Sequence, residues 1–168
     1  MLRRRFWEDG DRKDIEEGIQ LGRDVLALSP PGHPNHARLL SNLGVDLSTW
    51  FDQSGDRDDL DQAIQLHQDA LVLTPPGHPD RGTLLSNLAT CLSTRFNQSG
   101  DRDDLDQAIQ LGQDALVLRP PGHPDRDTLL SNLATHLSTR FDQSGDRDDL
   151  DQAIQLDQDA LVLTPPGH

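Results

Sequence analysis

Residues 79–123 read PDRGTLLSNLATCLSTRFNQSGDRDDLDQAIQLGQDALVLRPPGH, and the same stretch returns with five changes as residues 124–168. Residues 34–78 differ from it at eleven positions, and residues 1–33 match the later part of the same unit. A fixed period of this length is typical of repeat proteins, in which neighbouring units build a shared core. We therefore predict one array over residues 1–168, with an incomplete unit at 1–33 and full units at 34–78, 79–123 and 124–168.

The pattern within residues 79–123 predicts two helices. Leucine and alanine recur at helical spacing from Leu84 to Phe96, and Gly100 is a suitable C-terminal stop. In the second half, Asp101 is a suitable N-cap, and Pro120 ends the helix because proline has no N–H to donate. Repeated along the chain, this pattern predicts an all-α solenoid of seven helices in antiparallel pairs, preceded by the last turn of an eighth.

The composition limits the classes of partner. The chain has 29 acidic and 15 basic residues among 168, a net charge of −14, which argues against nucleic acid and anionic membranes. Its single cysteine excludes an internal disulfide and fits a reducing compartment. No apolar run approaches the ~18 residues of a membrane span, and the N-terminus lacks the apolar stretch of a signal peptide. We expect a cytoplasmic protein.

The two helices resemble those of the tetratricopeptide repeat (TPR). Residues 85–89, LSNLA, are similar to the start of that family's first helix, and residues 107–109 and Pro120 are similar to its second helix and terminal proline. The period exceeds the ~34 residues of the basic TPR. It is more similar to the longer repeats of kinesin light chains and to 45-residue arrays of fungal proteins, which often adjoin a caspase-like (CHAT) protease or a nucleotide-binding switch domain. The resemblance implies a right-handed superhelix and a non-catalytic scaffold that belongs to a larger protein and binds a protein or peptide.

In this family the first helices line a concave groove that receives the partner. Carried over by position, the partner-binding residues here are Asn42, Asn87, Asn132, Ser41, Ser86, Ser131, Thr90, Thr135, Thr94 and Thr139. These positions lie off the leucine stripe of their helix, and a carboxamide can both donate to and accept from a peptide backbone. The same asparagines could instead bond to a neighbouring helix and hold the stack together.

At three sets of equivalent positions each full copy carries a different residue. The sets are Asp46, Cys91 and His136; Gly22, His67, Gly112 and Asp157; and Ala37, Gly82 and Asp127. Variation concentrated at these positions could tune recognition unit by unit, or it could reflect neutral drift after duplication.

Several patterns that superficially suggest chemistry have simpler interpretations. The acidic turn that begins at Asp52 resembles a calcium loop, but Arg57 and Ala63 stand where an EF-hand needs glycine and glutamate, so helix capping explains it better. One histidine recurs in each inter-unit turn (His33, His78, His123 and His168), a spacing too wide for a short metal motif, so we expect capping or packing. Cys91 and His136 fall on neighbouring first helices, and nothing obvious orients the histidine as a base. We therefore expect no enzyme, metal or cofactor.

Two functions from different classes follow. The first is the protein- or peptide-binding scaffold described above. The alternative is a self-associating structural module, because an array without polar capping helices can stack one chain's end on another's start.

Overall fold

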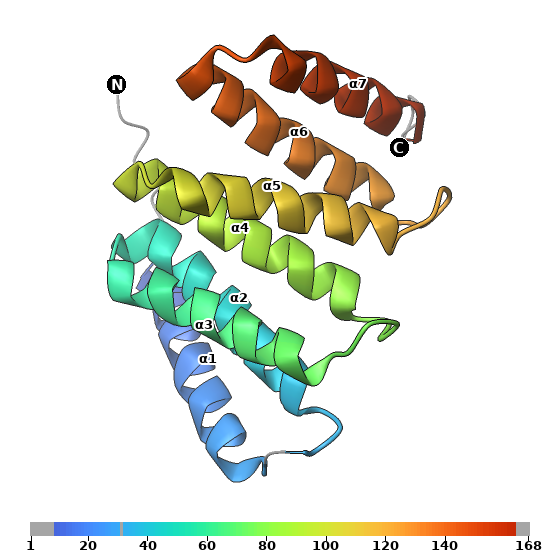
Figure 1. The fold of residues 1–168 in the computed structure, drawn as a ribbon. Helices are drawn as coiled ribbons and strands as arrows, with labels where there is room; N and C mark the ends of the chain where they lie inside the picture. Colours follow the sequence, from blue (N-terminus) through green and yellow to red (C-terminus); the bar gives the residue numbers. More distant parts are fainter. Residues whose placement is uncertain (1–8, 31, 164–168) are drawn as a thin grey trace. The chain divides into compact units, whose positions relative to one another are not determined.

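The computed structural model describes residues 9–30 and 32–163, which form helices joined by turns, with no strand (Figure 1). The helices of this part of the chain are α1 (Asp9–Leu28), α2 (His36–Ser54), α3 (Arg57–Leu73), α4 (Arg81–Ser99), α5 (Arg102–Val117), α6 (Arg126–Ser144) and α7 (Arg147–Leu163). The predicted two-helix repeat is confirmed in every full copy. The predicted last turn of an eighth helix lies outside the described residues.

The helices belong to two compact units, divided between Leu73 and Thr74. In the first unit α2 packs against α1 and α3. In the second unit α4 pairs with α5 and α6 pairs with α7, while α6 also packs against α5 and touches α4 (Figure 1). Packing between sequence neighbours is the arrangement of an α-solenoid, so the predicted fold class is confirmed. The single array over residues 1–168 stays a prediction.

Glycine ends each first helix of the full repeats. Gly55, Gly100 and Gly145 have φ of 70°, 73° and 72°, and each donates its N–H to the phenylalanine carbonyl four residues earlier. Only glycine adopts this left-handed conformation without steric cost. The aspartate that follows starts the second helix: Asp101 Oδ1 accepts from the N–H of Asp103 at 3.1 Å. The acidic turn therefore caps a helix, as predicted.

The turn before each first helix is organised by its histidine. The Nδ1 atoms of His33, His78 and His123 accept the backbone N–H two residues later, at 3.1, 3.2 and 3.2 Å. The predicted role in the turn is confirmed for these three, and His168 lies outside the described residues. Because Pro79 and Asp80 belong to this turn rather than to the first helical turn, helix α4 begins at Arg81.

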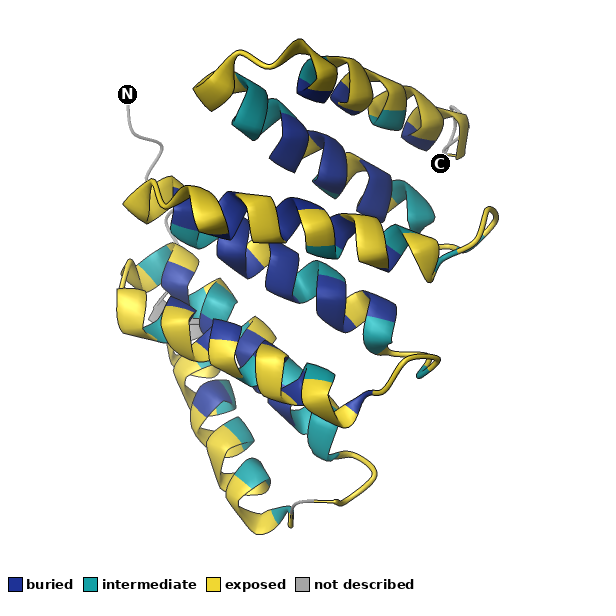
Figure 2. Ribbon diagram, in the orientation of Figure 1, coloured by how far each residue is buried: buried dark blue, intermediate teal, exposed yellow. Residues whose placement is uncertain are grey.

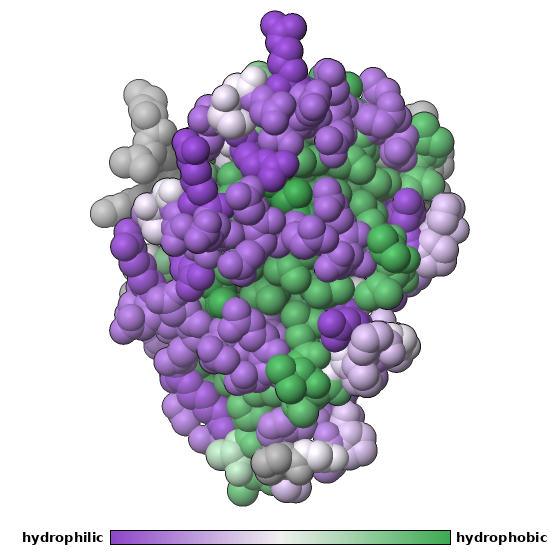
Figure 3. All heavy atoms as spheres, in the orientation of Figure 1, coloured by the Kyte–Doolittle hydropathy of each residue, from purple (hydrophilic) through white to green (hydrophobic). Residues whose placement is uncertain are grey.

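The core is built from the predicted leucine and alanine stripes. In α4, the six stripe residues from Leu84 to Phe96 are all buried, and α5 buries Leu105, Ala108, Ile109 and Ala115 (Figure 2). Leu118 follows the last residue of α5 and is 37 % exposed, so it does not belong to the buried stripe. In Figure 3 hydrophilic side chains predominate on the visible face, with apolar residues showing among them.

A buried ion pair joins the two helices of each repeat in the second unit. Arg140 of α6 donates from Nε and Nη2 to Asp149 of α7 at 2.8 and 2.7 Å, and from Nη1 to Asp106 of α5 at 2.9 Å. Arg95 and Asp104 form the same two-bond pair at 2.8 and 2.7 Å. Such bidentate pairs constrain geometry as well as charge. These pairs were not predicted from the sequence, although the nine-residue spacing recurs.

The first unit contains a close contact at the positions equivalent to Ala89 and Gly112. Gly44 of α2 faces the ring of His67 of α3, and a Cβ at residue 44 would lie 2.9 Å from both Cε1 and Nε2 of that ring. His67 is fully buried. The later repeats carry Ala89 and Ala134 where the first has Gly44, so the bulky histidine and the glycine are a matched pair.

We expect Gly44→Ala to lower the free energy of unfolding by about 1–3 kcal/mol, because the added methyl overpacks the site. Adding His67→Gly should restore stability, since the double variant recreates the Ala89 and Gly112 pair of the next repeat. Urea denaturation of the two single variants and the double variant measures the coupling. Additive losses would contradict the matched pair.

Candidate functional site

Residues predicted from two consecutive first helices gather around one pocket in the second unit. Here "α4–α6 pocket" denotes a hollow of about 230 Å³ lined by Gly82, Thr83, Ser86, Asn87, Thr90, Arg119, Asp125, Thr128, Leu129 and Asn132. Four of these are predicted partner-binding residues. Asn87 and Asn132 occupy equivalent positions in neighbouring repeats, so the pocket presents the same carboxamide twice.

The hydroxyl groups and the carboxamides near this pocket differ in their hydrogen bonding. Thr90 Oγ1 donates to the carbonyl of Ser86 at 3.1 Å, and Thr135 Oγ1 donates to that of Ser131 at 2.9 Å. Threonine bonds of this kind use the hydroxyl hydrogen and leave its lone pairs as acceptors. Within the described residues no hydrogen bond involves the carboxamides of Asn87 and Asn132. The asparagines therefore keep both donor and acceptor groups for a ligand.

One cation lies at the edge of the α4–α6 pocket and was not predicted. Arg119 donates from Nη2 to Thr83 Oγ1 at 2.9 Å. Its side chain fits there because residue 82 is glycine: a Cβ at that position would lie 3.0 Å from Arg119 Nε. The sequence signal for this cation is that Arg119 differs from its equivalent in the preceding repeat, Thr74.

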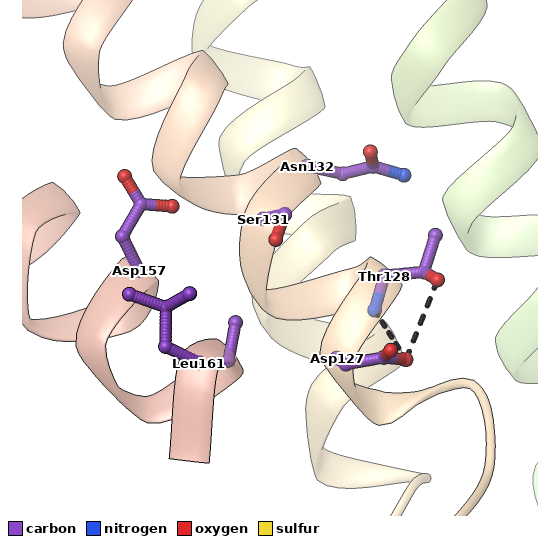
Figure 4. A pocket seen from close by; sticks show the side chains of 7 residues that line it. Asp127, Thr128, Ser131, Asn132, Asp157 and Leu161 are labelled. Carbon is purple, nitrogen blue, oxygen red and sulfur yellow. Dashed lines mark hydrogen bonds between the residues drawn. The ribbon is translucent and has the colours of Figure 1, made fainter. Parts of the chain in front are cut away.

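A second hollow lies along α6 and α7. This "α6–α7 pocket", of about 480 Å³, is lined by Asp127, Thr128, Ser131, Asn132, Asp157, Ala160 and Leu161 (Figure 4). Asp157 and Leu161 of α7 face Ser131 of α6, while the Asn132 side chain points away from Asp157. Asp127 Oδ1 accepts from the N–H of Thr128 at 2.7 Å. Two carboxylates thus border a partly apolar hollow.

The remaining predicted residues do not line either pocket. Ser41 and the exposed Asn42 lie on α2 in the first unit. Thr94 and Thr139 are half-buried and donate to the carbonyls of Thr90 and Thr135, at 2.9 and 2.8 Å. The role of the whole predicted set in binding stays a prediction.

The side chains of three variable residues are buried rather than presented to a ligand. His67 is 0 % exposed, Cys91 4 % and His136 5 %. Both nitrogens of His67 and Nδ1 of His136 have no hydrogen-bond partner among the described residues. Burial lowers the pKa of each histidine to about 4, because the charged form is poorly solvated. At these three positions the side chain packs inside the protein, and the hypothesis of tuned recognition stays a prediction.

Residues 9–30 and 32–163 contain no group of three or more His, Cys, Asp and Glu side chains suited to hold a metal ion. None of their helices combines the length and the apolar character needed to cross a bilayer.

Comparison with known proteins concerns the fold. No protein-family model and no curated protein matches the sequence. Among solved structures, the "DHF58 filament" has a TM-score of 0.50 and 18% sequence identity, covering 92% of this chain and 84% of that chain. The "DHF119 filament" has a TM-score of 0.45 and 19% sequence identity, covering 94% of this chain and 84% of that chain. The de novo designed helical repeat protein DHR64 has a TM-score of 0.46 and 20% sequence identity, covering 93% of this chain and 84% of that chain. At these identities the likeness to the first of these structures shows a shared helical-repeat fold and nothing about ligands.

Proposed function

We propose that this chain is a non-catalytic scaffold that binds an extended segment of another protein across its first helices, as the resemblance to long TPR arrays implies. The observation that carries the proposal is the α4–α6 pocket. Its two equivalent carboxamides, Asn87 and Asn132, come from consecutive repeats. An extended peptide also repeats its donors and acceptors along its length, so a repeated carboxamide is suited to hold its backbone.

The placement of charge supports the same proposal. The acidic residues cap the second helices, and those helices have exposed charged faces, whereas the α4–α6 pocket is mainly polar and uncharged apart from Arg119 and Asp125. The net charge of −14 would speed the approach of basic partners. We also propose that the module belongs to a larger cytoplasmic protein, in which another domain acts after the partner has bound.

A selection from a random peptide library tests the proposal. Peptides selected on the intact protein should bind the Asn87→Ala/Asn132→Ala variant at least tenfold more weakly, because two hydrogen bonds of about 1 kcal/mol each are lost. Fluorescence anisotropy gives the affinities. Gln113→Ala/Gln158→Ala, on exposed positions of α5 and α7, is the matched control and should change them less than twofold. Failure to select any peptide, or equal losses in both variants at equal stability, would reject groove binding.

Self-association is the second candidate function, and exposed apolar residues on α7 favour it. Ile154 is 48 % exposed, whereas its equivalent Ile109 in the preceding repeat is 4 % exposed. Leu161 and Val162 are also exposed, at 70 and 82 %. A mass that rises with protein concentration would support this function.

A further inference from the structure

The α6–α7 pocket occupies the place at which a following repeat would pack. Its residues Asp127, Ser131, Asp157 and Leu161 are equivalent to Gly82, Ser86, Gly112 and Leu116 of the preceding repeat. In that repeat α6 packs over the equivalent surface: Leu133 of α6 lies against Gly112, and Leu129 lines the smaller pocket that remains. The α6–α7 pocket is therefore the socket for a repeat helix.

Where a repeat does pack on such a socket within a compact unit, the second helix presents glycine. A Cβ at Gly22 would lie 3.2 Å from Leu43 Cδ1, and one at Gly112 would lie 3.2 Å from Leu133 Cδ1. A methyl group is at the limit of what fits, so a larger side chain would displace the leucine. The equivalent position holds His67 in the first full repeat.

A larger side chain at this position can instead pack against the first helix of its own repeat, as the first unit shows. His67 lies over its own first helix because residue 44 there is glycine. In the last repeat that position is Ala134, which is buried and whose methyl group occupies the space. Asp157 is exposed and borders the socket instead (Figure 4). Asp127 adds a second carboxylate where the preceding repeat has Gly82.

We propose that Asp127 and Asp157 close the array after α7 against a further repeat of the same kind, whether supplied by a second copy or by an added segment. Packing a leucine-bearing helix on this socket would bury the Asp157 carboxylate against a leucine side chain, as the Leu133 contact of Gly112 shows. It would also enclose the Asp127 carboxylate at the place where Gly82 borders the α4–α6 pocket. Unpaired buried charge strongly disfavours such contact. The exposed apolar residues of α7 then do not lead to end-to-end stacking, so this inference stands apart from peptide binding and opposes the self-association candidate.

The internal socket allows a test within the chain. Gly112→Asp should speed amide hydrogen exchange throughout α6 at least 100-fold by weakening its packing on α5, and Gly112→Asn should have a smaller effect. Gly112→Ala should change exchange less than tenfold, because Leu133 needs to shift only by tenths of an ångström and alanine favours the helix. Equal exchange in the Asp and Ala variants would overturn the charge argument.

The end of the array itself is tested by adding a copy of residues 79–123 after His168. With Asp127 and Asp157 present, limited proteolysis should trim the added copy at least tenfold faster than in the Asp127→Gly/Asp157→Gly chain, because only the latter holds it against α7. Mass spectrometry follows the loss of the extension. Equal trimming rates would overturn the proposal. So would self-association of the unextended wild-type chain through α7, seen as a mass that rises with protein concentration and falls again when α7 is blocked.

Discussion

Arg140→Ala is expected to lower the free energy of unfolding by about 2–3 kcal/mol. The change leaves Asp149, which is 3 % exposed, without the bidentate partner that holds it at 2.7 and 2.8 Å, and it also releases Asp106. Breaking a buried pair by removing one member costs about 3–5 kcal/mol. The arginine side chain is 35% exposed, so solvent screens part of that cost.

Chemical denaturation at pH 7 measures this loss. Arg147→Ala is the matched control, because Arg147 is exposed at the start of α7, and it should change stability by less than about 0.5 kcal/mol. Arg140→Met/Asp149→Leu should recover much of the loss by removing both charges together. Equal stability of the Arg140→Ala and Arg147→Ala variants would show that the pair contributes nothing.

Acidification from pH 6.5 to 4 is expected to destabilise the protein through its two buried histidines. In the unfolded chain their pKa is near 6.5, and burial lowers the pKa of His67 and His136 to about 4. The unfolded state therefore binds more protons in this interval. The contribution of each histidine to the free energy of unfolding is fully present above pH 6.5 and decreases as the pH falls. The decrease is up to about 1.4 kcal/mol per pH unit and totals about 3 kcal/mol for each histidine.

Variants separate the contribution of the histidines to this pH dependence from that of the carboxylates. His136→Cys, which places the residue of the preceding repeat at this position, should remove one part of the slope, and adding His67→Leu should remove the other. Arg140 lowers the pKa of Asp149, which gives a further loss only as the carboxylate itself protonates at lower pH. Unfolding free energies from pH 4 to 7 distinguish these contributions. An unchanged slope in the double variant would show that neither histidine is responsible.

The same comparison of copies that predicted the helices could not predict what their differing residues do. His67 and Asp157 hold equivalent positions, yet one ring is fully buried and the other side chain is exposed. The difference depends on Gly44 and Ala134, which lie on another helix. Likewise, Arg119 borders the α4–α6 pocket because Gly82, thirty-seven residues earlier, leaves room for it.

The sequence by itself determined the helices, the glycine-terminated ends of the first helices and the repeat, because these depend on local signals. Leucine and alanine spacing marks the buried face, glycine at Gly55, Gly100 and Gly145 provides the left-handed stop, and aspartate caps the next helix. Tertiary structure decided the rest: the ion pair of Arg140, the burial of His136 and the two pockets. These features arise between helices, where the space left by one side chain sets the position and solvation of another, and no regular spacing along the chain records that geometry.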